Sequence, residues 1–511
     1  MIKKFPFFLF CFLCYGTAIH AQNKKPNILI ILTDDQGYHD VSYYGTKDIR
    51  TPNIDAIRNA GMRFDYFYTN SPVCAPTRAS LMSGRFPDLV GVPGLIRSTP
   101  DNNWGYLQPG TILLPQALKQ AGYRTAHIGK WNLGLESPNL PNEKGFDLFH
   151  GWLEDMMDDY WTHLRHGKNF MRLNKEAIEP VGHATELFTK WSIDYIQQQA
   201  SSKNPFFLYL AYTAPHFPIQ AYEQDIVKYE KLYEQGWDIT RTNRYKKMIQ
   251  LGLIDKRYQL TERPADIEDW DKVADKKQWV RKMAVYAAMV DRMDQNIGRL
   301  IATLKANKQY DNTLIIFMSD NGGCAENVDG RNFNDKNVPI GAKGSYVTYD
   351  YPWANVSNTP FRKYKKFMHE GGMITPCIIQ WPAKIKAKPG FNEGVGHIID
   401  LLPTSLELAG VPINNLPGQS LSYLWNGKAM QPETYFWEHV GNKAMRKGNW
   451  KIVKDIEDAD WELYDMSTDL TESNNLAKIN TTLLNQMIAE YELWTKKNSV
   501  KVFVKGKNKA D

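Results

Sequence analysis

The sequence contains little cysteine, no long apolar run beyond its first residues and little net charge. Only five cysteines occur in 511 residues, and a chain of this length buries enough apolar surface to fold without a disulfide framework. Mean hydropathy is −0.48 and aromatic residues make up 13% of the chain. These values exclude the multi-span membrane, collagen-like and disordered classes.

The N-terminal segment has the layout of an export signal. Lys3 and Lys4 precede an apolar stretch over residues 5–16, and small residues follow as far as Ala21. We predict a signal peptide over 1–21, because the stretch is too short to anchor a helix in a bilayer. Lipid attachment at Cys14 is the weaker alternative, since bulky Leu13 precedes it. We therefore expect an exported protein, periplasmic or secreted, with no membrane span and three remaining cysteines, an odd number that points to a free or modified thiol.

The formal charge of +6 lies mostly at the two ends of the chain. The lysines of the signal segment account for part of it, and residues 496–511 hold six lysines against one aspartate. The remaining body is close to neutral, so we expect no nucleic-acid partner. Any recognition of an anion must be local.

The apolar pattern predicts an α/β fold. Short runs rich in Ile, Leu and aromatics alternate with helix-like stretches, which is typical of buried, largely parallel strands. The runs are 28–32, 124–128, 206–212, 314–318 and 376–381. Apolar residues three or four apart over 285–304 predict a long helix. We expect surface helices over 221–279, a catalytic domain over 22–410, and a small C-terminal α+β subdomain over 411–511 with strands at 445–453 and 461–465 and a helix at 483–494.

Polar residues follow four of the predicted strands. In open α/β sheets, ligands bind beyond the carboxyl ends of the strands, so these residues should share one rim. Carboxylate and amide oxygens suit Ca²⁺ best. The alternative is that Asp34-Asp35 caps a helix and Asp320-Asn321 forms a turn. The residues in question are Asp34, Asp35, Lys130, His216, Asp320 and Asn321.

A cysteine begins another segment of interest, Cys74-Ala75-Pro76-Thr77-Arg78. Pro76 suits the first turn of a helix and Gly84 suits its end. Cys74 would then lie at the positive end of the helix, where an anion or thiolate is favoured, and Arg78 could bind an oxyanion. On these grounds alone a buried structural cysteine is the favoured interpretation.

Residues 74–85 resemble the signature of the sulfatase family, whose Cys-x-Pro-x-Arg core is read by a modifying enzyme. Residues 122–134 resemble the family's second signature. Family-like stretches also occur at 27–37, 205–218, 319–323, 358–372, 437–453 and 461–477. The chain is therefore similar to formylglycine-dependent type I sulfatases, arylsulfatase-like members of the alkaline phosphatase superfamily. This resemblance implies a large mixed, mostly parallel sheet flanked by helices.

The resemblance also implies a chemistry. A formylglycine-generating maturation enzyme would convert Cys74 into an aldehyde, whose hydrate attacks a sulfate ester and then expels the sulfate. One Ca²⁺ per chain would lower the pKa of this nucleophile. Arg78, Lys130 and Lys365 would hold sulfate oxygens, with Lys363 and Lys366 as neighbours that could be mistaken for Lys365. His216 would lie near the leaving oxygen, where its imidazolium or a lysine could protonate the departing alcohol. The implied metal ligands are Asp34, Asp35, the modified Cys74, Asp320 and Asn321.

One position departs from the family pattern. Sulfatases usually carry histidine where this chain has Asn132, and that histidine is thought to help release sulfate. An asparagine cannot take up a proton near neutral pH. His39, just after the Asp34-Asp35 pair, is an alternative base, whereas His127 is expected to be packed inside its strand.

Two clusters could select the substrate. Residues 150–161 mix aromatics with carboxylates and include Asp159 and Trp161, which could bind a sugar, although a covering loop with a solvated acidic edge is an equal alternative. His439 and Arg446 of the C-terminal subdomain could close over the pocket.

The sequence thus favours the hydrolysis of sulfate esters in sulfated glycans. The glycan rests on family analogy. The alternatives are a phosphodiesterase or phosphonate hydrolase of the same superfamily, and a non-catalytic glycan-binding protein with unmodified Cys74. Cys324 and Cys377 are expected either to pair or to be two buried thiols.

Overall fold

The computed structural model describes residues 24–99, 106–386, 392–426, 434–501 and 503. The predicted signal peptide, with Cys11 and Cys14, lies outside the described residues. Among the helices that the structure describes, none is both long and apolar enough to cross a membrane.

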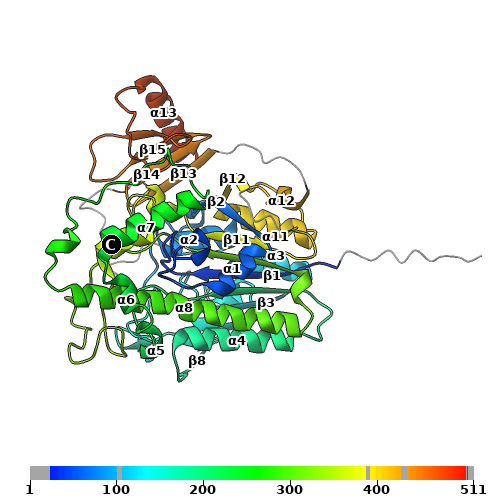
Figure 1. Ribbon diagram of the computed structural model, residues 1–511. Coiled ribbons are helices and arrows are strands. Elements are labelled where there is room, and N and C mark those ends of the chain that lie inside the picture. The colour runs from blue at the N-terminus through cyan, green and yellow to red at the C-terminus, as the bar shows by residue number, and fades with distance from the viewer. Residues whose placement is uncertain (1–23, 100–105, 387–391, 427–433, 502, 504–511) are drawn as a thin grey trace, which may run out of the picture.

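A ten-stranded mixed sheet forms the centre of the molecule, as Figure 1 shows. Its order is β12-β2-β11-β10-β1-β9-β3-β4-β7-β8, and the run from β10 to β4 is parallel. The strands β11, β7 and β8 pair antiparallel with their neighbours. The bounds are β1 (Asn27–Thr33), β2 (Met62–Tyr68), β3 (Arg124–Lys130), β4 (Leu148–Trp152), β7 (Met171–Leu173), β8 (Glu176–Ala177), β9 (Phe206–Ala211), β10 (Thr313–Ser319), β11 (Cys377–Gln380) and β12 (Asn392–His397), with a separate hairpin of β5 (Leu164–Arg165) and β6 (Lys168–Asn169).

Helices cover both faces of this sheet, which explains why its strands are almost continuously apolar. In β1, Ile28 and Ile30 point into one core cluster, while Leu29 and Ile31 point into the other. The first cluster lies under α2 (Cys74–Ser83), α3 (Leu114–Gln120) and α11 (Leu401–Ala409), and the second under α1 (Pro52–Asn59), α4 (Ala184–Gln198) and α8 (Lys276–Ala306). The predicted α/β fold with a mixed, mostly parallel sheet is confirmed.

The remaining helices lie in the connections. The predicted helix over 285–304 is part of the longer α8, whose start is fixed by the Asp275 side chain accepting a hydrogen bond from the Gln278 N–H at 3.3 Å. The charged stretch before it is helical, as predicted. Its helices are α5 (Glu223–Ile226), α6 (Glu230–Tyr233) and α7 (Gly236–Gln250), and α9 (Asp350–Ser357) and α10 (Glu370–Met373) follow α8.

The C-terminal sheet is a four-stranded antiparallel sheet with α13 (Thr481–Lys497) packed on it. The prediction of one strand over 445–453 is wrong, because the chain turns at Gly448 (φ 56°) and forms a hairpin. Met445 and Ile452 lie on either side of that turn in one apolar cluster, so the pattern reads as continuous. The strands are β13 (Thr434–His439), β14 (Asn442–Lys447), β15 (Trp450–Lys454) and β16 (Glu462–Asp465), preceded by α12 (Tyr423–Asn426). The domain boundary at residue 410 stays a prediction.

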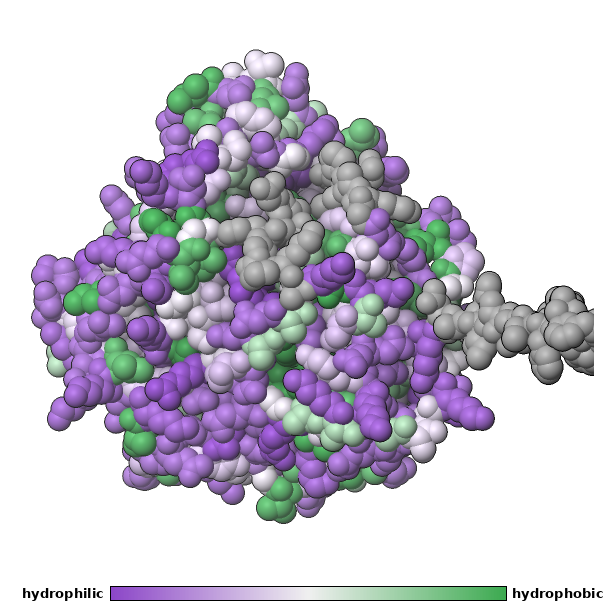
Figure 2. Space-filling view, turned by 45° about the vertical axis from the view of Figure 1, so that its right-hand side comes forward, coloured by the Kyte–Doolittle hydropathy of each residue, from purple (hydrophilic) through white to green (hydrophobic). Residues whose placement is uncertain are grey.

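Buried charges join the C-terminal sheet to the large domain. The Lys451 ammonium is fully buried and donates to the Met368 carbonyl at 2.9 Å, to Glu472 at 2.8 Å and to Glu370. Glu472 in turn accepts from the Glu370 N–H at 2.8 Å. These bonds hold the segment that carries Lys365. Elsewhere the visible surface is mostly hydrophilic, with scattered apolar residues (Figure 2).

We expect Lys451→Met to destabilise the fold strongly, because it leaves Glu370 and Glu472 buried without their cation. Removing one partner of a buried ion pair costs about 3–5 kcal/mol. Lys447→Met is the matched control, since Lys447 forms an exposed pair with Glu490 and its loss should cost about 1 kcal/mol or less. Urea unfolding measures both variants, and equal midpoints would contradict the assignment.

Candidate active site

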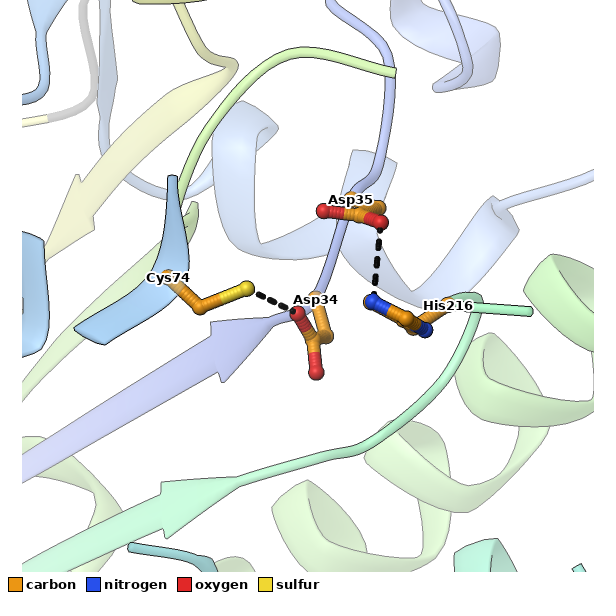
Figure 3. Close-up of side chains that lie close together, drawn as sticks. All are labelled: Asp34, Asp35, Cys74 and His216. Atoms are coloured by element: carbon orange, nitrogen blue, oxygen red, sulfur yellow. Dashed lines mark hydrogen bonds and ion pairs between the residues drawn. The ribbon is translucent and has the colours of Figure 1, made fainter. Parts of the chain in front are cut away.

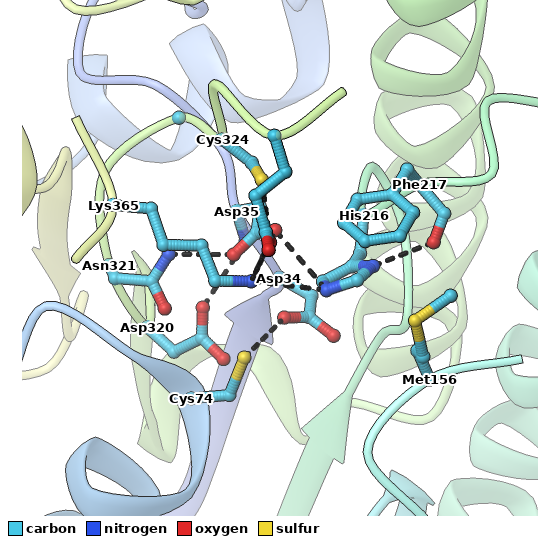
Figure 4. A network of polar contacts seen from close by, with 12 residues as sticks. Asp34, Asp35, Cys74, Met156, His216, Phe217, Asp320, Asn321, Cys324 and Lys365 are labelled. Atoms are coloured by element: carbon cyan, nitrogen blue, oxygen red, sulfur yellow. Dashed lines mark hydrogen bonds and ion pairs between the residues drawn. The ribbon is translucent and has the colours of Figure 1, made fainter. Parts of the chain in front are cut away.

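The predicted rim residues converge at the carboxyl ends of the parallel strands, as Figures 3 and 4 show. Asp34 and Asp35 follow β1, while Asp320 and Asn321 follow β10. Lys130 ends β3, and His216 lies in the loop after β9. The first turn of α2 brings Cys74 to the same place, and Gly84 (φ 62°) ends that helix as predicted. The convergence follows from the topology, because adjacent parallel strands end at one edge.

Three carboxylates and three cations alternate in this cluster. The Asp34 carboxylate accepts from Lys130 Nζ at 2.7 Å and from Cys74 Sγ at 3.4 Å. The Asp35 carboxylate accepts from Lys365 Nζ at 2.9 Å and from Asn321 Nδ2 at 2.7 Å. Arg78 donates to Asp320 at 2.7 and 3.1 Å and to the Lys130 carbonyl at 3.0 Å. The cluster is therefore close to neutral although it is almost completely buried.

Burial sets the protonation states of the side chains around Cys74. Burial raises the pKa of the Cys74 thiol well above its usual value, although Lys130 and Lys365 oppose this. The thiol therefore stays protonated and is a poor nucleophile as it stands. Burial, together with Asp320, raises the pKa of Asp34 to about 7. Although burial opposes it, the Lys365 ammonium and the hydrogen bond from Asn321 hold the pKa of Asp35 below its usual value.

His216 is neutral and accepts a hydrogen bond from Lys365. Burial lowers the pKa of His216 to about 4, despite the nearby Asp35 carboxylate. Its Nδ1 lies 2.6 Å from the Phe217 carbonyl, so Nδ1 carries the hydrogen and Nε2 accepts from Lys365 Nζ at 3.1 Å. The proton at this corner of the site thus belongs to Lys365.

The residues fit a hard divalent cation. Ligand atoms of Asp34, Asp35, Cys74 and His216 all lie within 4.8 Å of one another. Asn321 Oδ1 is buried and has no hydrogen-bond partner among the described residues, which is costly unless a ligand satisfies it. The oxygens available from Asp34, Asp35, Asp320 and Asn321 are of the type that Ca²⁺ prefers. This buried group can therefore bind a metal.

A cavity of about 400 Å³ opens above Cys74. Cys74, His216 and Lys365 lie among its lining residues, whereas Arg78 and Lys130 lie beneath, bound to the carboxylates. The sequence analysis did not assign most of the other lining residues, which come from separate loops with no motif. They are Leu95, Arg97, Thr99, Asp155, Met156, Arg165, His166, Phe217, Glu326, Arg331 and Lys366.

Comparison with known proteins agrees with this geometry. The family model described as sulfatase matches residues 26–411, and the model for the C-terminal part of N-sulphoglucosamine sulphohydrolase matches residues 361–497. The chain belongs to the sulfatase family. An uncharacterized sulfatase of Schizosaccharomyces pombe is 34% identical, with 93% of each chain covered, and an arylsulfatase of Klebsiella aerogenes is 32% identical over 78% of this chain and 90% of its own. The crystal structure of Ps i-CgsB in complex with k-i-k-neocarrahexaose superimposes with a TM-score of 0.70 at 27% identity, covering 93% of each chain.

This sulfatase is a sulfuric ester hydrolase, and its predicted substrate-binding residues can now be placed. Asp159 accepts from the Trp161 and Thr162 N–H groups at 2.8 and 2.9 Å, so it caps a turn. Trp161 packs edge-on against His183 and Tyr222. Neither is among the residues that line the cavity, although Asp155 and Met156 of the same segment are. An alternation of aromatics and acids does not reveal which side chains face inward.

His39, His439 and Arg446, three further residues singled out in the sequence, are also held by packing or hydrogen bonds and do not line the cavity. His39 is buried beside Tyr44, and burial holds its pKa well below the usual value, so it does not reach the cavity as a free base. His439 Nδ1 lies 3.2 Å from the Pro93 carbonyl. Arg446 donates to the Tyr68 hydroxyl and to the Gly448 carbonyl. His127 is stacked between Tyr209 and Phe149, as expected for a packed residue.

The remaining cysteines are two buried free thiols, not a disulfide. Cys377 lies in β11, and the Cys324 thiol donates to Glu326 at 3.4 Å. Of the two expectations left open by the sequence, the buried thiols are confirmed.

Asn132 takes a left-handed conformation (φ 54°) directly after β3. Its Nδ2 donates to the Ile96 carbonyl at 2.9 Å, and its side chain is fully buried. Through this bond it holds the loop that supplies Leu95 and Arg97 to the cavity. This is the position at which the family resemblance leads us to expect a histidine.

We expect Asn132→His to speed the release of sulfate, because histidine adds a proton acceptor that asparagine lacks and tolerates the left-handed conformation. Pre-steady-state kinetics should show an unchanged first turnover and a faster, pH-dependent steady state. Asn132→Gln is the control that changes size without adding a base. Equal rates for the wild type and Asn132→His at every pH would contradict the prediction.

Proposed function

We propose that this sulfatase removes sulfate from sulfated glycans, using a nucleophile made from Cys74 and one bound Ca²⁺. The observation that carries the proposal is the position of Cys74: it begins a buried helix at the base of a cavity, between a carboxylate cluster and the ammonium groups of Lys130 and Lys365. No other cysteine among the described residues lines that cavity.

Two groups would complete this site. Formylglycine at position 74, produced by a maturation enzyme, would supply a hydrated aldehyde that attacks sulfur and can later expel sulfate. Ca²⁺ held by Asp34, Asp35, Asp320, Asn321 and residue 74 would supply positive charge that lowers the pKa of that nucleophile.

The chain's own residues bind and orient the ester. Lys365 Nζ faces the cavity and carries a proton, because the Asp35 carboxylate raises its pKa well above the usual value against the effect of burial. We assign Lys365 to the sulfate oxygens, with the charge of Lys130 adding to it from beneath the cavity, where it binds Asp34. The Lys365–His216 pair is assigned to the departing alcohol, which needs a proton as its bond to sulfur breaks. Arg78 fixes Asp320 and the end of β3, so it acts by keeping the carboxylates in place.

The nature of the cavity supports a carbohydrate substrate. Its lining is dominated by charged and polar side chains, which suit hydroxyl and sulfate groups better than an apolar ligand. Ps i-CgsB, with a similar fold, has been crystallised with k-i-k-neocarrahexaose. We further propose that the enzyme acts in the periplasm or the medium, as the predicted signal peptide implies.

The test compares sulfate and phosphate esters of one leaving group. The protein from its native host is given 4-nitrophenyl sulfate, bis(4-nitrophenyl) phosphate and sulfated oligosaccharides, and sulfate and nitrophenol are measured. We expect the sulfate ester to be hydrolysed faster than the phosphate diester. Preference for the phosphate ester would support the phosphodiesterase alternative, and no turnover of any ester would support the glycan-binding alternative.

A further inference from the structure

The outer wall of the cavity above Cys74 holds an excess of positive charge. Four cations line it in addition to Lys365: Arg97, Arg165, Arg331 and Lys366. Two carboxylates, Asp155 and Glu326, line it with them. Because the body of the chain is close to neutral, this excess is local rather than a consequence of overall charge.

Each of these carboxylates is shared between two cations. Asp155 binds Arg97 Nε at 2.8 Å through one oxygen and Arg165 Nε at 3.3 Å through the other. Glu326 binds Lys366 at 2.9 Å and lies 3.9 Å from Lys365. The two carboxylates thus hold the cations without neutralising the wall, and Asp158, which binds Arg165 at 2.8 Å, is not among the lining residues.

Of the cations that line this cavity, Arg331 has no side-chain partner among the described residues. Its side chain is exposed, and its guanidinium forms no hydrogen bond or ion pair with the described residues. Its backbone is held in a turn, with the N–H donating to the Val328 carbonyl at 2.9 Å. It lies close enough to His166 to oppose protonation of that ring. The turn therefore holds the backbone of Arg331 at the edge of the cavity, and its five guanidinium donors have no partner among the described residues.

We propose that the substrate carries a second anionic group, a carboxylate or another sulfate, and that Arg331 binds it with Arg97 and Arg165. The inference rests on the proposed function, in which Lys365, His216 and residue 74 take the sulfate that is cleaved. Guanidinium groups match planar or tetrahedral oxyanions with two parallel hydrogen bonds. A substrate with one sulfate alone would leave the outer cations facing neutral hydroxyls.

The test measures kcat/KM for related probes. These are 4-methylumbelliferyl sulfate, a monosaccharide whose single sulfate is its only charge, the disulfated form of that sugar, and a monosulfated disaccharide that contains a uronate. We expect kcat/KM to be higher for the two dianionic sugars than for the monosulfated monosaccharide, and this difference should shrink as salt is added. Whichever of the two is faster identifies the second anion as sulfate or carboxylate.

Variants locate the binding group. Arg331→Gln should lower kcat/KM about 10-fold for dianionic sugars, the scale of one lost charged hydrogen bond, and leave 4-methylumbelliferyl sulfate unchanged. Arg331→Lys should recover part of the loss. Lys336→Gln is the control, since Lys336 is exposed in the same segment and does not line the cavity.

The two proposals fail in different ways. If no probe is hydrolysed, the proposed function fails and this inference with it. The inference alone is overturned if the monosulfated monosaccharide is hydrolysed as fast as the dianionic sugars. It is also overturned if Arg331→Gln and Lys336→Gln have the same kcat/KM on every probe.

Discussion

Cys74→Ala should abolish sulfate ester hydrolysis while leaving the protein folded. Loss of a catalytic nucleophile lowers kcat by a factor on the order of 10⁴ to 10⁶. Cys74 is buried, but alanine lacks only its sulfur atom, so the truncation removes few contacts besides the hydrogen bond to Asp34. Sulfate release and the thermal unfolding midpoint, measured on the same preparation, separate the loss of chemistry from the loss of structure.

The matched control is Cys377→Ala, the same substitution at a buried thiol in the central sheet. It should keep full activity, because Cys377 does not line the cavity. Cys74→Ser adds a second comparison, since serine keeps the size of the side chain but has no second oxygen with which to expel sulfate. Activity of Cys74→Ala within about 10-fold of the wild type would refute the assignment of the nucleophile, because residual catalysis from binding alone is far smaller.

Removal of Ca²⁺ should both inactivate and destabilise the enzyme. Asn321 Oδ1 has no partner among the described residues, and the negative charges of Asp320 and Asp35 add to burial in raising the pKa of Asp34, so a bound cation would satisfy the amide oxygen and stabilise the Asp34 carboxylate. A ligand that binds only the folded state stabilises it by about 2.7 kcal/mol at 100 times its dissociation constant. We expect chelation to lower the unfolding midpoint and Ca²⁺ to restore both the midpoint and the activity.

Asn321→Ala shows whether the ion acts at this site. It removes an amide oxygen ligand while leaving all three carboxylates, so the stabilisation by Ca²⁺ should shrink or disappear. Asn358→Ala is not a suitable control, because Asn358 accepts from the Gly323 N–H within the neighbouring loop. Asn337→Ala is suitable, since Asn337 is exposed and bonds only Asp335 among the described residues. An equal Ca²⁺ shift in wild type and Asn321→Ala would place the ion elsewhere.

The central strands and the residues at their ends could be read from the sequence because both follow local rules. Strands buried on both faces are continuously apolar, as in Ile28–Leu32, and the first polar residues after them mark the rim. The signature around Cys74 then identified which rim residues work together. The local pattern also explains why a single strand was wrongly predicted over 445–453. The turn at Gly448 lies between Met445 and Ile452, which belong to one apolar cluster.

The cavity wall could not be predicted in the same way. Arg165 lies in the β5–β6 hairpin, whereas Arg97 and Arg331 lie in two loops, and only the folded chain brings the three to one cavity. Trp161 and Asp159 are residue types that suit a sugar as well as these arginines suit an anion. In the structure, however, Trp161 packs against His183 and Asp159 accepts hydrogen bonds within a turn. Specificity thus depends on long-range placement, which residue type and spacing do not encode.

The structure of residue 74 in the native protein tests the central claim most directly. Mass spectrometry of the peptide that contains residue 74, taken from protein made in its native host, distinguishes cysteine from formylglycine, in which one oxygen replaces the sulfur and two hydrogens. The account predicts the formylglycine peptide in an enzyme that releases sulfate. Unmodified cysteine alone, in a preparation that releases sulfate at full rate, would contradict it.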